Sequence, residues 1–423
     1  MNKRVDLSAI IPTVNENENI IHLIPEIRKV LSGLTNYYEI IVVDGGSKDN
    51  TVDTARSLGA KTIIQKREGY GGALKDGFEC AKGTYILTMD ADLSHEPKFI
   101  KNMWESRQDA KIIIGSRYIP GGAAKMPFVR KLLSIILNLC FSRILSLPIK
   151  DLSSGFRLYH RHIISEIVLD GRNFEILEEI LIKCIAQGYK IIEIPLIYVP
   201  RKSGRSKAKL FKFGVDLLKT LTKMWCLRNS ISSADYDERA YNSIIPFQRY
   251  WQRKRHNIIT KIAVDNKSIL DIGCGSSQII KTLNNVTGID ININRLHYMR
   301  QYKIPLANAS AFALPFKNNV FDCVICSQVI EHIPFDMILF QEMRRVLKAG
   351  GCLIIGTPDY SKITWRIIEF LYGIIIPGGY KDEHITHYNR KELNKYLCEN
   401  GFNFISKYYI CNSELIMRFE RAE

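Results

Sequence analysis

Short apolar runs rich in β-branched residues alternate with longer amphipathic segments over residues 6–200. The runs include SAIIPTV, EIIVVDG, TYILTMD and KIIIGSR, and the segments between them have helical patterns. Strands and helices in this alternation predict an α/β domain with a largely parallel sheet. In such sheets ligands bind at the carboxyl ends of the strands.

A second alternation of the same kind begins at KSILDIGCGSS. A polar, serine-rich stretch near residue 230 and a helical stretch at about 237–263 precede it. A chain of 423 residues is too long for one ordinary hydrophobic core. We therefore predict two α/β domains, residues 1–229 and 266–423, with a linker and helical lead-in over 230–265.

Two carboxylates lie side by side in TMDADLSHEP, where only Ala91 separates Asp90 from Asp92 at the end of an apolar strand. Like charges this close repel unless a cation or hydrogen bonds offset the repulsion. Oxygen ligands on a loop suit Mg²⁺ or Mn²⁺, so the pair is a candidate metal site. The alternative is a structural turn in which Asp90 caps a helix and Asp92 faces solvent.

The chain is basic, with a formal net charge of +16, and the excess is larger in residues 1–229 than in the remainder. This charge favours an anionic partner such as a phosphate, an acidic lipid or a nucleic acid. The sequence contains neither a recognised nucleic-acid-binding motif nor a basic run interleaved with stacking aromatics. We therefore expect no nucleic-acid partner.

Two basic, amphipathic stretches, residues 127–147 and 208–228, are candidates for helices that lie on a membrane surface. The longest apolar stretch is interrupted by polar residues and proline, which makes it a poor membrane span. Packing on the domain is the alternative for the second stretch. Its apolar face contains Leu210, Phe213, Leu217 and Leu221.

The start of the chain, MNKRVDLSAIIPTV, has no signal-peptide core, and the ten cysteines are scattered. Scattered cysteines indicate reduced thiols in the cytosol. With the basic stretches, this predicts a peripheral protein on the cytoplasmic face of the cell membrane.

Four more segments surround the paired carboxylates: IIPTVNENENI, IVVDGGSKDNT, REGYGGALKDGFECAKG and DLSSGFRLYHR. Together with MDADLSHEP, GSRY and PRKSGRSK, they resemble glycosyltransferase family 2, and within it the dolichyl- or polyprenyl-phosphate mannose synthases. The resemblance spans residues 6 to about 210. It implies a GT-A-type fold, a nucleotide-diphosphate sugar donor and a polyprenyl phosphate acceptor.

The resemblance also implies roles for individual residues. The nucleotide-sugar set is Pro12, Thr13, Glu16, Asp44 and Asp90, and the metal set is Asp90 and Asp92. The acceptor-phosphate set is Arg117, Arg130, Ser134, Arg201, Ser206 and Lys207, and Asp92 and Arg117 are the expected catalytic residues. A surface charge is the alternative for each arginine taken singly. Processive synthases need a Q-x-x-R-W element that is absent after the core, so a single transfer is expected.

ILDIGCGSS, in the second half, is a strand followed by a turn that contains Gly273 and Gly275. Asp290 ends the next strand, where a carboxylate can bind ribose hydroxyls, and the missing third glycine disfavours NAD. With FALPFKNNVFDCVICSQVIEHI and EMRRVLKAGGCLIIGTPDY, the region from 240 to 420 resembles class I S-adenosylmethionine-dependent methyltransferases. The resemblance implies a Rossmann-like fold and cofactor contacts from Asp271, Gly273, Gly275, Asp290 and Ala311.

Three histidines are candidate bases for methyl transfer: His332, the residue we select as catalytic, and His384 or His387. The amine-methylating motif N-P-P-Y is absent, which favours an oxygen or another acceptor. The sequence thus predicts a bifunctional enzyme that transfers a hexose to a polyprenyl phosphate and methylates an unidentified acceptor. The hexose that we favour is mannose. The alternative is a glycosyltransferase for glucose or another sugar with a non-catalytic, methyltransferase-like docking module.

Overall fold

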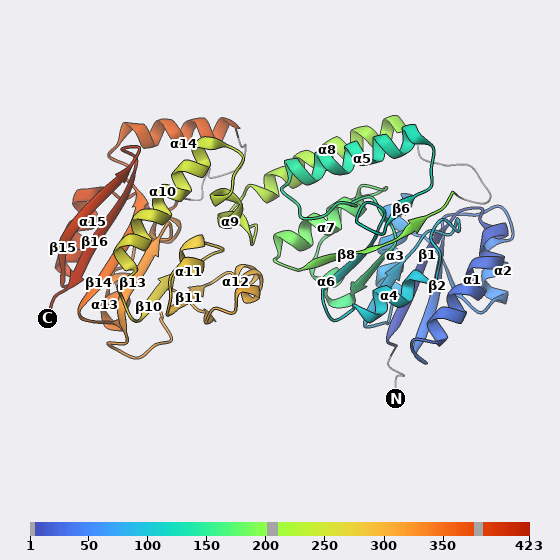
Figure 1. Cartoon of the computed structure of the whole chain (residues 1–423), viewed down its shortest axis with the longest axis horizontal. Helices are drawn as coiled ribbons and strands as arrows, with labels where there is room; N and C mark the ends of the chain where they lie inside the picture. Colours follow the sequence, from blue (N-terminus) through green and yellow to red (C-terminus); the bar gives the residue numbers. More distant parts are fainter. Residues whose placement is uncertain (1–4, 201–209, 376–383) are drawn as a thin grey trace. The chain divides into compact units, whose positions relative to one another are not determined.

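The computed structural model of the chain describes residues 5–200, 210–375 and 384–423. Contacts between Cα atoms divide the chain into two compact units, residues 1–185 with 189–225 and residues 186–188 with 226–423. Each unit contains a seven-stranded sheet with helices, so the predicted class of two α/β domains is confirmed (Figure 1).

The sheet of the first unit is parallel except for β7, which runs antiparallel to both of its neighbours. Strand order reverses at β1, because β2 and β3 lie on one side of it and β4 on the other. Across the sheet the strands are β3 (Lys61–Ile64), β2 (Tyr38–Asp44), β1 (Leu7–Thr13), β4 (Tyr85–Thr88), β7 (Arg157–His160), β5 (Ile112–Ser116) and β8 (Ile191–Pro195). A small parallel pair consists of β6 (Ala123–Ala124) and β9 (Ile197–Tyr198).

The central strand β1 is buried along nearly its whole length, as expected for a parallel strand covered on both faces. Helix α1 turns Ile20, Leu23, Ile27 and Leu31 into the core at helical spacing. The helices of this unit are α1 (Asn17–Ser32), α2 (Thr51–Ser57), α3 (Gly69–Cys80), α4 (Phe99–Glu105), α5 (Phe128–Ile144), α6 (Arg161–Glu166), α7 (Ile176–Ala186) and α8 (Leu210–Arg228), the last of which continues into the second unit.

The sheet of the second unit has five parallel strands, followed by two antiparallel strands at one edge. Strand order reverses at β10, between β11 and β13. Across the sheet the strands are β12 (Leu306–Asn308), β11 (Val286–Asp290), β10 (Ile269–Ile272), β13 (Phe321–Ser327), β14 (Leu347–Pro358), β16 (Glu414–Arg421) and β15 (Phe402–Ile410).

The segment that we assigned to a linker and helical lead-in belongs to the core of the second unit. Trp251 and Ile259 are buried against residues of this sheet. Arg255 forms an ion pair with the buried Glu414, with 2.6 Å between Nη2 and Oε2. The helices of the unit are α9 (Tyr236–Tyr241), α10 (Pro246–Ala263), α11 (Gln278–Thr282), α12 (Ile293–Met299), α13 (Met337–Val346), α14 (Ile363–Ile375) and α15 (Arg390–Glu399), with short 3₁₀ turns η1 (Arg300–Tyr302) and η2 (Ile330–His332).

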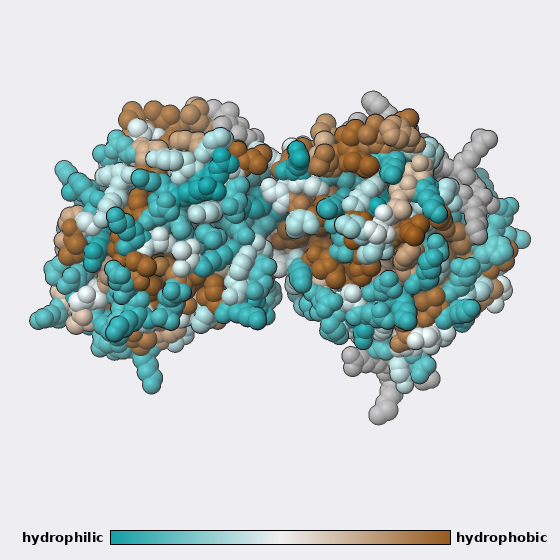
Figure 2. All heavy atoms as spheres, in the orientation of Figure 1, coloured by the Kyte–Doolittle hydropathy of each residue, from teal (hydrophilic) through white to brown (hydrophobic). Residues whose placement is uncertain are grey.

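Helix α5 carries an unusually apolar exposed surface. Phe128 and Val129 are 76% and 68% exposed. Figure 2 shows apolar side chains gathered over α5 in the first unit and over α14 in the second. Further exposed apolar residues of α5 are Leu132, Leu133, Ile135, Ile136, Leu139 and Ile144. Within the described residues, no helix is both long and apolar enough to cross a bilayer.

Candidate active sites

The first site lies where strand order reverses in the first sheet, the usual ligand position in an open α/β sheet. Thr13 ends β1 and pairs in register with Asp44, which ends β2. Pro12 precedes Thr13 on the same strand, so three members of the predicted nucleotide-sugar set lie together at this edge. The sheet, through the register of its two strands, brings these residues together.

Asp44 is buried, and its carboxylate organises the loop that follows β2. Oδ2 accepts hydrogen bonds from the backbone N–H groups of Gly46 at 2.9 Å and Ser47 at 2.8 Å. Glu16, at the start of α1, accepts a 2.6 Å hydrogen bond from the Asn19 side chain. Both carboxylates are therefore held in place by the first turns that follow the strands.

Asp90 and Asp92 follow β4, the neighbour of β1 in the sheet. The Tyr70 hydroxyl donates a 3.1 Å hydrogen bond to Asp90 Oδ1, and Ser94 N–H donates one of 3.1 Å to Asp92 Oδ1. Desolvation and the Asp90 carboxylate raise the pKa of Tyr70 well above its usual range, so the phenol stays a donor. The donor set consists of hard carboxylate oxygens, which fits Mg²⁺ or Mn²⁺.

The purely structural alternative for this pair does not match its surroundings. Asp92 is only 7% exposed, so it does not face solvent. The helix that follows, α4, has Lys98 rather than Asp90 at its N-cap. Gly155 also approaches closely, since a Cβ there would lie 3.3 Å from Asp90 Oδ1 and 2.8 Å from the Tyr70 hydroxyl. The site has no room for a side chain at this point.

Arg117 follows β5 and is bound to Asp151, a residue that is fully buried. Nε and Nη2 donate to the two carboxylate oxygens at 2.8 and 2.7 Å, and Nη2 also donates to the Ser153 hydroxyl at 2.8 Å. Desolvation opposes the charge of Arg117, but the hydrogen bonds and charge of Asp151 outweigh it and raise the pKa of Arg117 further. Removing either partner would leave a buried charge, at a cost of about 3–5 kcal/mol.

The other predicted acceptor residues fall into two groups. Arg130 is exposed on α5, and Ser134 on the same helix accepts a 2.8 Å hydrogen bond from the Tyr118 hydroxyl. Tyr118 directly follows Arg117, so this bond ties α5 to the Arg117 loop. Arg201, Ser206 and Lys207 lie outside the described residues.

The second site is a cavity of about 490 Å³ at the carboxyl ends of β10, β11 and β13. Five of the six residues that we predicted for the second site line it: Asp271, Gly273, Asp290, Ala311 and His332. Gly275 does not line the cavity, although its neighbour Cys274 does. Gly273 and Gly275 have φ values of +67° and +52°, which favour glycine. A Cβ on Gly273 would lie 2.3 Å from a Val329 methyl group, so the turn requires glycine there.

Asp290 holds this turn from the neighbouring strand. Oδ2 accepts a 3.0 Å hydrogen bond from Gly275 N–H, and Oδ1 accepts one of 2.8 Å from Asn292 N–H. The Arg295 guanidinium lies 3.6 Å from Oδ2. Asp237, which was not predicted from the sequence, accepts a 3.0 Å hydrogen bond from Ser276 N–H and so fixes the other side of the turn.

Asp271 lies inside β10 and is nearly inaccessible to solvent. Burial, with smaller contributions from the charges of Asp290 and Asp237, raises the pKa of Asp271 to about 8. The Asp271 carboxyl is therefore mostly protonated at neutral pH. A proton here relieves the repulsion among three acidic side chains that meet below the glycine turn.

Two of the three candidate bases lie together. The rings of His332 and His384 are 4.8 Å apart between centroids. Burial lowers the pKa of His384 to about 4. His387 is separate and stacks on Tyr360 at 4.0 Å. Glu331, which was not predicted from the sequence, adjoins His332 in the motif IEHI and completes this cluster.

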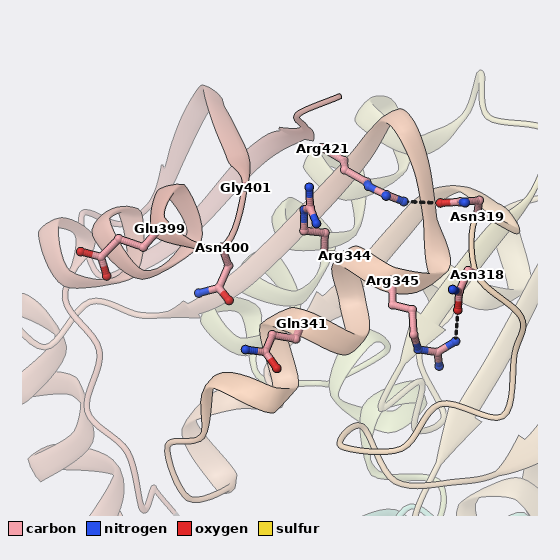
Figure 3. A pocket seen from close by; sticks show the side chains of 9 residues that line it. All are labelled: Asn318, Asn319, Gln341, Arg344, Arg345, Glu399, Asn400, Gly401 and Arg421. Carbon is pink, nitrogen blue, oxygen red and sulfur yellow. Dashed lines mark hydrogen bonds between the residues drawn. The ribbon is translucent and has the colours of Figure 1, made fainter.

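A larger cavity, of about 610 Å³, lies away from the predicted chemistry. Its wall includes Arg344, Arg345 and Arg421 (Figure 3). Arg345 is paired with Glu342 at 2.6 Å and also donates to main-chain carbonyls. Arg421 donates to the Asn319 side chain. These contacts tie the start of β13 to α13 and β16, which is a structural role.

Comparison with known proteins finds a family model that matches part of each half of the chain. The family model for glycosyl transferase family 2 matches residues 8–168, and the model for a methyltransferase domain matches residues 270–355. Both resemblances seen in the sequence are confirmed. With the two sheet topologies, they confirm the fold class: a GT-A-type glycosyltransferase domain followed by a Rossmann-like methyltransferase domain.

Two curated relatives resemble the first half. The dolichol-phosphate mannosyltransferase of Pyrococcus furiosus is 37% identical over 214 residues, which are 48% of this chain and 59% of the relative. The dolichyl-phosphate hexose transferase of Haloferax volcanii is 27% identical over 226 residues, 53% of this chain and 96% of the relative. A solved glucosyl-3-phosphoglycerate synthase from Mycobacterium tuberculosis, in complex with Mn²⁺, UDP and phosphoglyceric acid, aligns with 18% identity and a TM-score of 0.43, over 52% of this chain and 78% of that one.

The raised pKa of Asp271 predicts how stability depends on pH. Between its ordinary pKa of 3.8 and about 8, the folded state keeps a proton that the unfolded state has lost, so the free energy of unfolding falls as pH rises. One such group contributes up to about 1.4 kcal/mol per pH unit. Asp271→Asn should therefore reduce the loss of thermal stability between pH 5 and pH 8, measured by scanning calorimetry. Asp322→Asn, on the surface, is the control, and an unchanged profile for Asp271→Asn would contradict the assignment.

Proposed function

We propose that this chain, which carries a glycosyl transferase family 2 domain and a methyltransferase domain, transfers a hexose from a nucleotide-diphosphate sugar to a polyprenyl or dolichyl phosphate. The hexose we favour is mannose, and the second domain methylates an acceptor of the same pathway with S-adenosylmethionine. The observation that carries the first activity is the pair Asp90 and Asp92 at the strand reversal, beside Thr13 and Asp44. The names of the two curated relatives support the lipid phosphate as acceptor.

In the first reaction, Asp90 and Asp92 would hold a divalent cation, which supplies positive charge for the departing diphosphate. Thr13, Asp44 and Glu16 would position the nucleotide. A lipid phosphate is ionised at neutral pH, so its oxygen attacks the sugar C1 without a strong base. The work of the remaining residues is positioning and charge stabilisation.

Arg117 is the candidate for orienting the acceptor phosphate. Its planar guanidinium suits phosphate recognition, and Asp151 fixes its direction through two hydrogen bonds. Ser134 is linked to the same loop through Tyr118, and Arg130 is exposed one turn earlier on α5. Arg201, Ser206 and Lys207 complete the proposed set from outside the described residues.

The exposed face of α5 supports attachment to a membrane surface, where a polyprenyl acceptor is found. Eight of its apolar residues are exposed, and Arg130, Lys131 and Arg143 lie on the same helix. Apolar residues that insert shallowly, with basic residues that attract anionic lipids, favour a helix in the interface. We propose a peripheral protein on the cytoplasmic face of the cell membrane.

For the second activity, the cavity at the carboxyl ends of the strands supports a cofactor site. The glycine turn allows a close approach of the cofactor, and Asp290 would bind the ribose. Ala311 lines the part of the wall that would lie beside the adenine. This arrangement is the observation that favours methyl transfer over a non-catalytic docking module.

Asp92→Asn should reduce sugar transfer by several orders of magnitude while the protein stays folded. Loss of a bound metal removes several kcal/mol of stabilisation from the leaving group. The measurement is transfer of labelled sugar from a panel of nucleotide sugars to polyprenyl phosphate, with and without EDTA. Glu96→Gln, in the same loop, is the matched control. Full activity in EDTA would refute the metal site.

Replacing Phe128 and Val129 together by serine should weaken binding to anionic liposomes by at least tenfold. Each side chain contributes about 1.5–3 kcal/mol when fully buried, and less when inserted shallowly. Flotation at low and high salt measures the effect, and binding should fall with salt. Val168→Ser is the control because Val168 is exposed elsewhere in the same unit. Equal flotation of both proteins would contradict the proposal.

Asp290→Ala should weaken binding of S-adenosylmethionine without changing sugar transfer. The substitution removes the proposed ribose acceptor and the bonds to Gly275 and Asn292. Isothermal titration of the full chain with S-adenosylhomocysteine measures affinity, and Asp322→Ala is the control. If the unaltered protein does not bind at millimolar concentration, the docking-module alternative replaces methyl transfer.

A further inference from the structure

We propose that Glu331, His332 and His384 form a binding site for a divalent transition-metal ion on the wall of the methyltransferase cavity. Zn²⁺ is the ion that we favour. One ligand atom from each of the three residues lies within 4.8 Å of the others. His332 also lines the 490 Å³ cavity, so an ion there would face the space where methyl transfer takes place. This site is separate from the carboxylate pair of the first domain.

The main chain brings the three residues together. Glu331 and His332 belong to the turn η2, directly after β13. The segment that contains His384 is fastened to this turn, since Ile385 N–H donates to Glu331 O at 2.8 Å and Thr386 N–H donates to the same oxygen at 3.1 Å. The cluster is therefore formed by the fold rather than by chance rotamers on a surface.

Glu331 is fully buried, and neither of its carboxylate oxygens has a hydrogen-bond partner of ordinary geometry among the described residues. A buried, ionised carboxylate without hydrogen bonds or a cation beside it lowers the stability of the folded protein. A bound dication would neutralise this carboxylate and take one of its oxygens and the two neighbouring imidazoles as ligands.

The surroundings of His384 resemble the outer contacts of a metal-binding histidine. Its Nδ1 lies 2.6 Å from the Tyr360 hydroxyl and 3.4 Å from Glu369, and Tyr360 donates to Glu369 at 2.8 Å. Such a partner fixes the tautomer in which Nδ1 carries the proton and Nε2 can bind a metal. The side chain of His384 is 3% exposed, so its ring has little freedom.

The ligand types identify the class of ion. Two imidazoles and one carboxylate are a typical set for Zn²⁺ with one position open to water or substrate. Bonds of about 2.1 Å in a tetrahedral site place ligand atoms about 3.4 Å apart. Side-chain shifts of about 1 Å would bring the three ligand atoms, now within 4.8 Å of one another, to that separation. Mg²⁺, which prefers oxygen ligands, is a poorer match.

The open position would select a hydroxyl acceptor; this step rests on the proposed methyl transfer, whereas ion binding does not. A bound cation lowers the pKa of a coordinated hydroxyl, which releases its proton to water. The oxygen then forms a C–O bond with the sulfonium methyl of S-adenosylmethionine. The methyl–sulfur bond breaks, and its electron pair returns to sulfur. In this scheme His332 is a ligand rather than the general base.

The test measures zinc binding by the full chain after chelator treatment and removal of any affinity tag. We expect one equivalent of Zn²⁺ that is retained in Asp92→Asn, so that it is independent of the first domain. Glu331→Gln and His384→Ala should weaken this binding by at least about 100-fold, and Tyr360→Phe, which alters only the outer contact, by about tenfold. His256→Ala is the matched control and should bind Zn²⁺ normally, because His256 also lines the cavity but is not part of the cluster.

Cobalt provides a second readout that does not depend on activity. Co²⁺ in the unaltered protein should give visible absorption bands of a tetrahedral site, and these should be lost in folded Glu331→Gln. Circular dichroism verifies that each variant is folded. Absence of stoichiometric Zn²⁺ binding, or equal binding by Glu331→Gln, His384→Ala and the unaltered protein, would overturn the proposal. Zinc binding without methyl transfer would support the site and refute the acceptor step.

Discussion

Repulsion among carboxylates at the carboxyl ends of parallel strands is the constraint on which both halves of the molecule depend. Each sheet gathers acidic side chains where its strand order reverses, because that edge is open to ligands. The first domain offsets the charge with donors, such as Tyr70 beside Asp90. The second also uses a proton, held on Asp271, and the nearby guanidinium of Arg295. Each solution leaves room for a cationic ligand.

This constraint explains why several acidic residues of the two sites could be predicted from the sequence. The strands were recognisable from their apolar runs, and the residue at a strand end was therefore known. Asp44, Asp90 and Asp290 could be assigned to ligand sites because parallel strands share one edge. The packing of 246–263 into the second core was not visible, because Trp251 and its neighbours meet residues more than 150 positions away in the chain.

Contacts between distant segments limited the prediction of the sites as well. The motif of Arg117 suggested a role in binding the acceptor phosphate, but it gave no sign of the ion pair with Asp151. That pair forms because the chain after β5 lies beside the segment that precedes β7. Likewise His384 and Glu331 are 53 positions apart, and only the hydrogen bonds of Ile385 and the following residue bring them together. The spacing of residues in the sequence does not predict such contacts between distant segments.

The charge of the second cavity depends on which groups hold protons. With Asp271 protonated, Asp290 and Asp237 are the acidic groups beside the glycine turn, and the Arg295 guanidinium balances part of their charge. That state suits a ribose hydroxyl and a cationic sulfonium better than it suits an anionic acceptor. A dication at Glu331 changes this balance, since its two positive charges exceed the single negative charge of one carboxylate. The cavity wall near His332 would then attract an acceptor oxygen that is losing its proton. Whether the cluster of Glu331, His332 and His384 holds an ion therefore decides which kind of acceptor the domain can use.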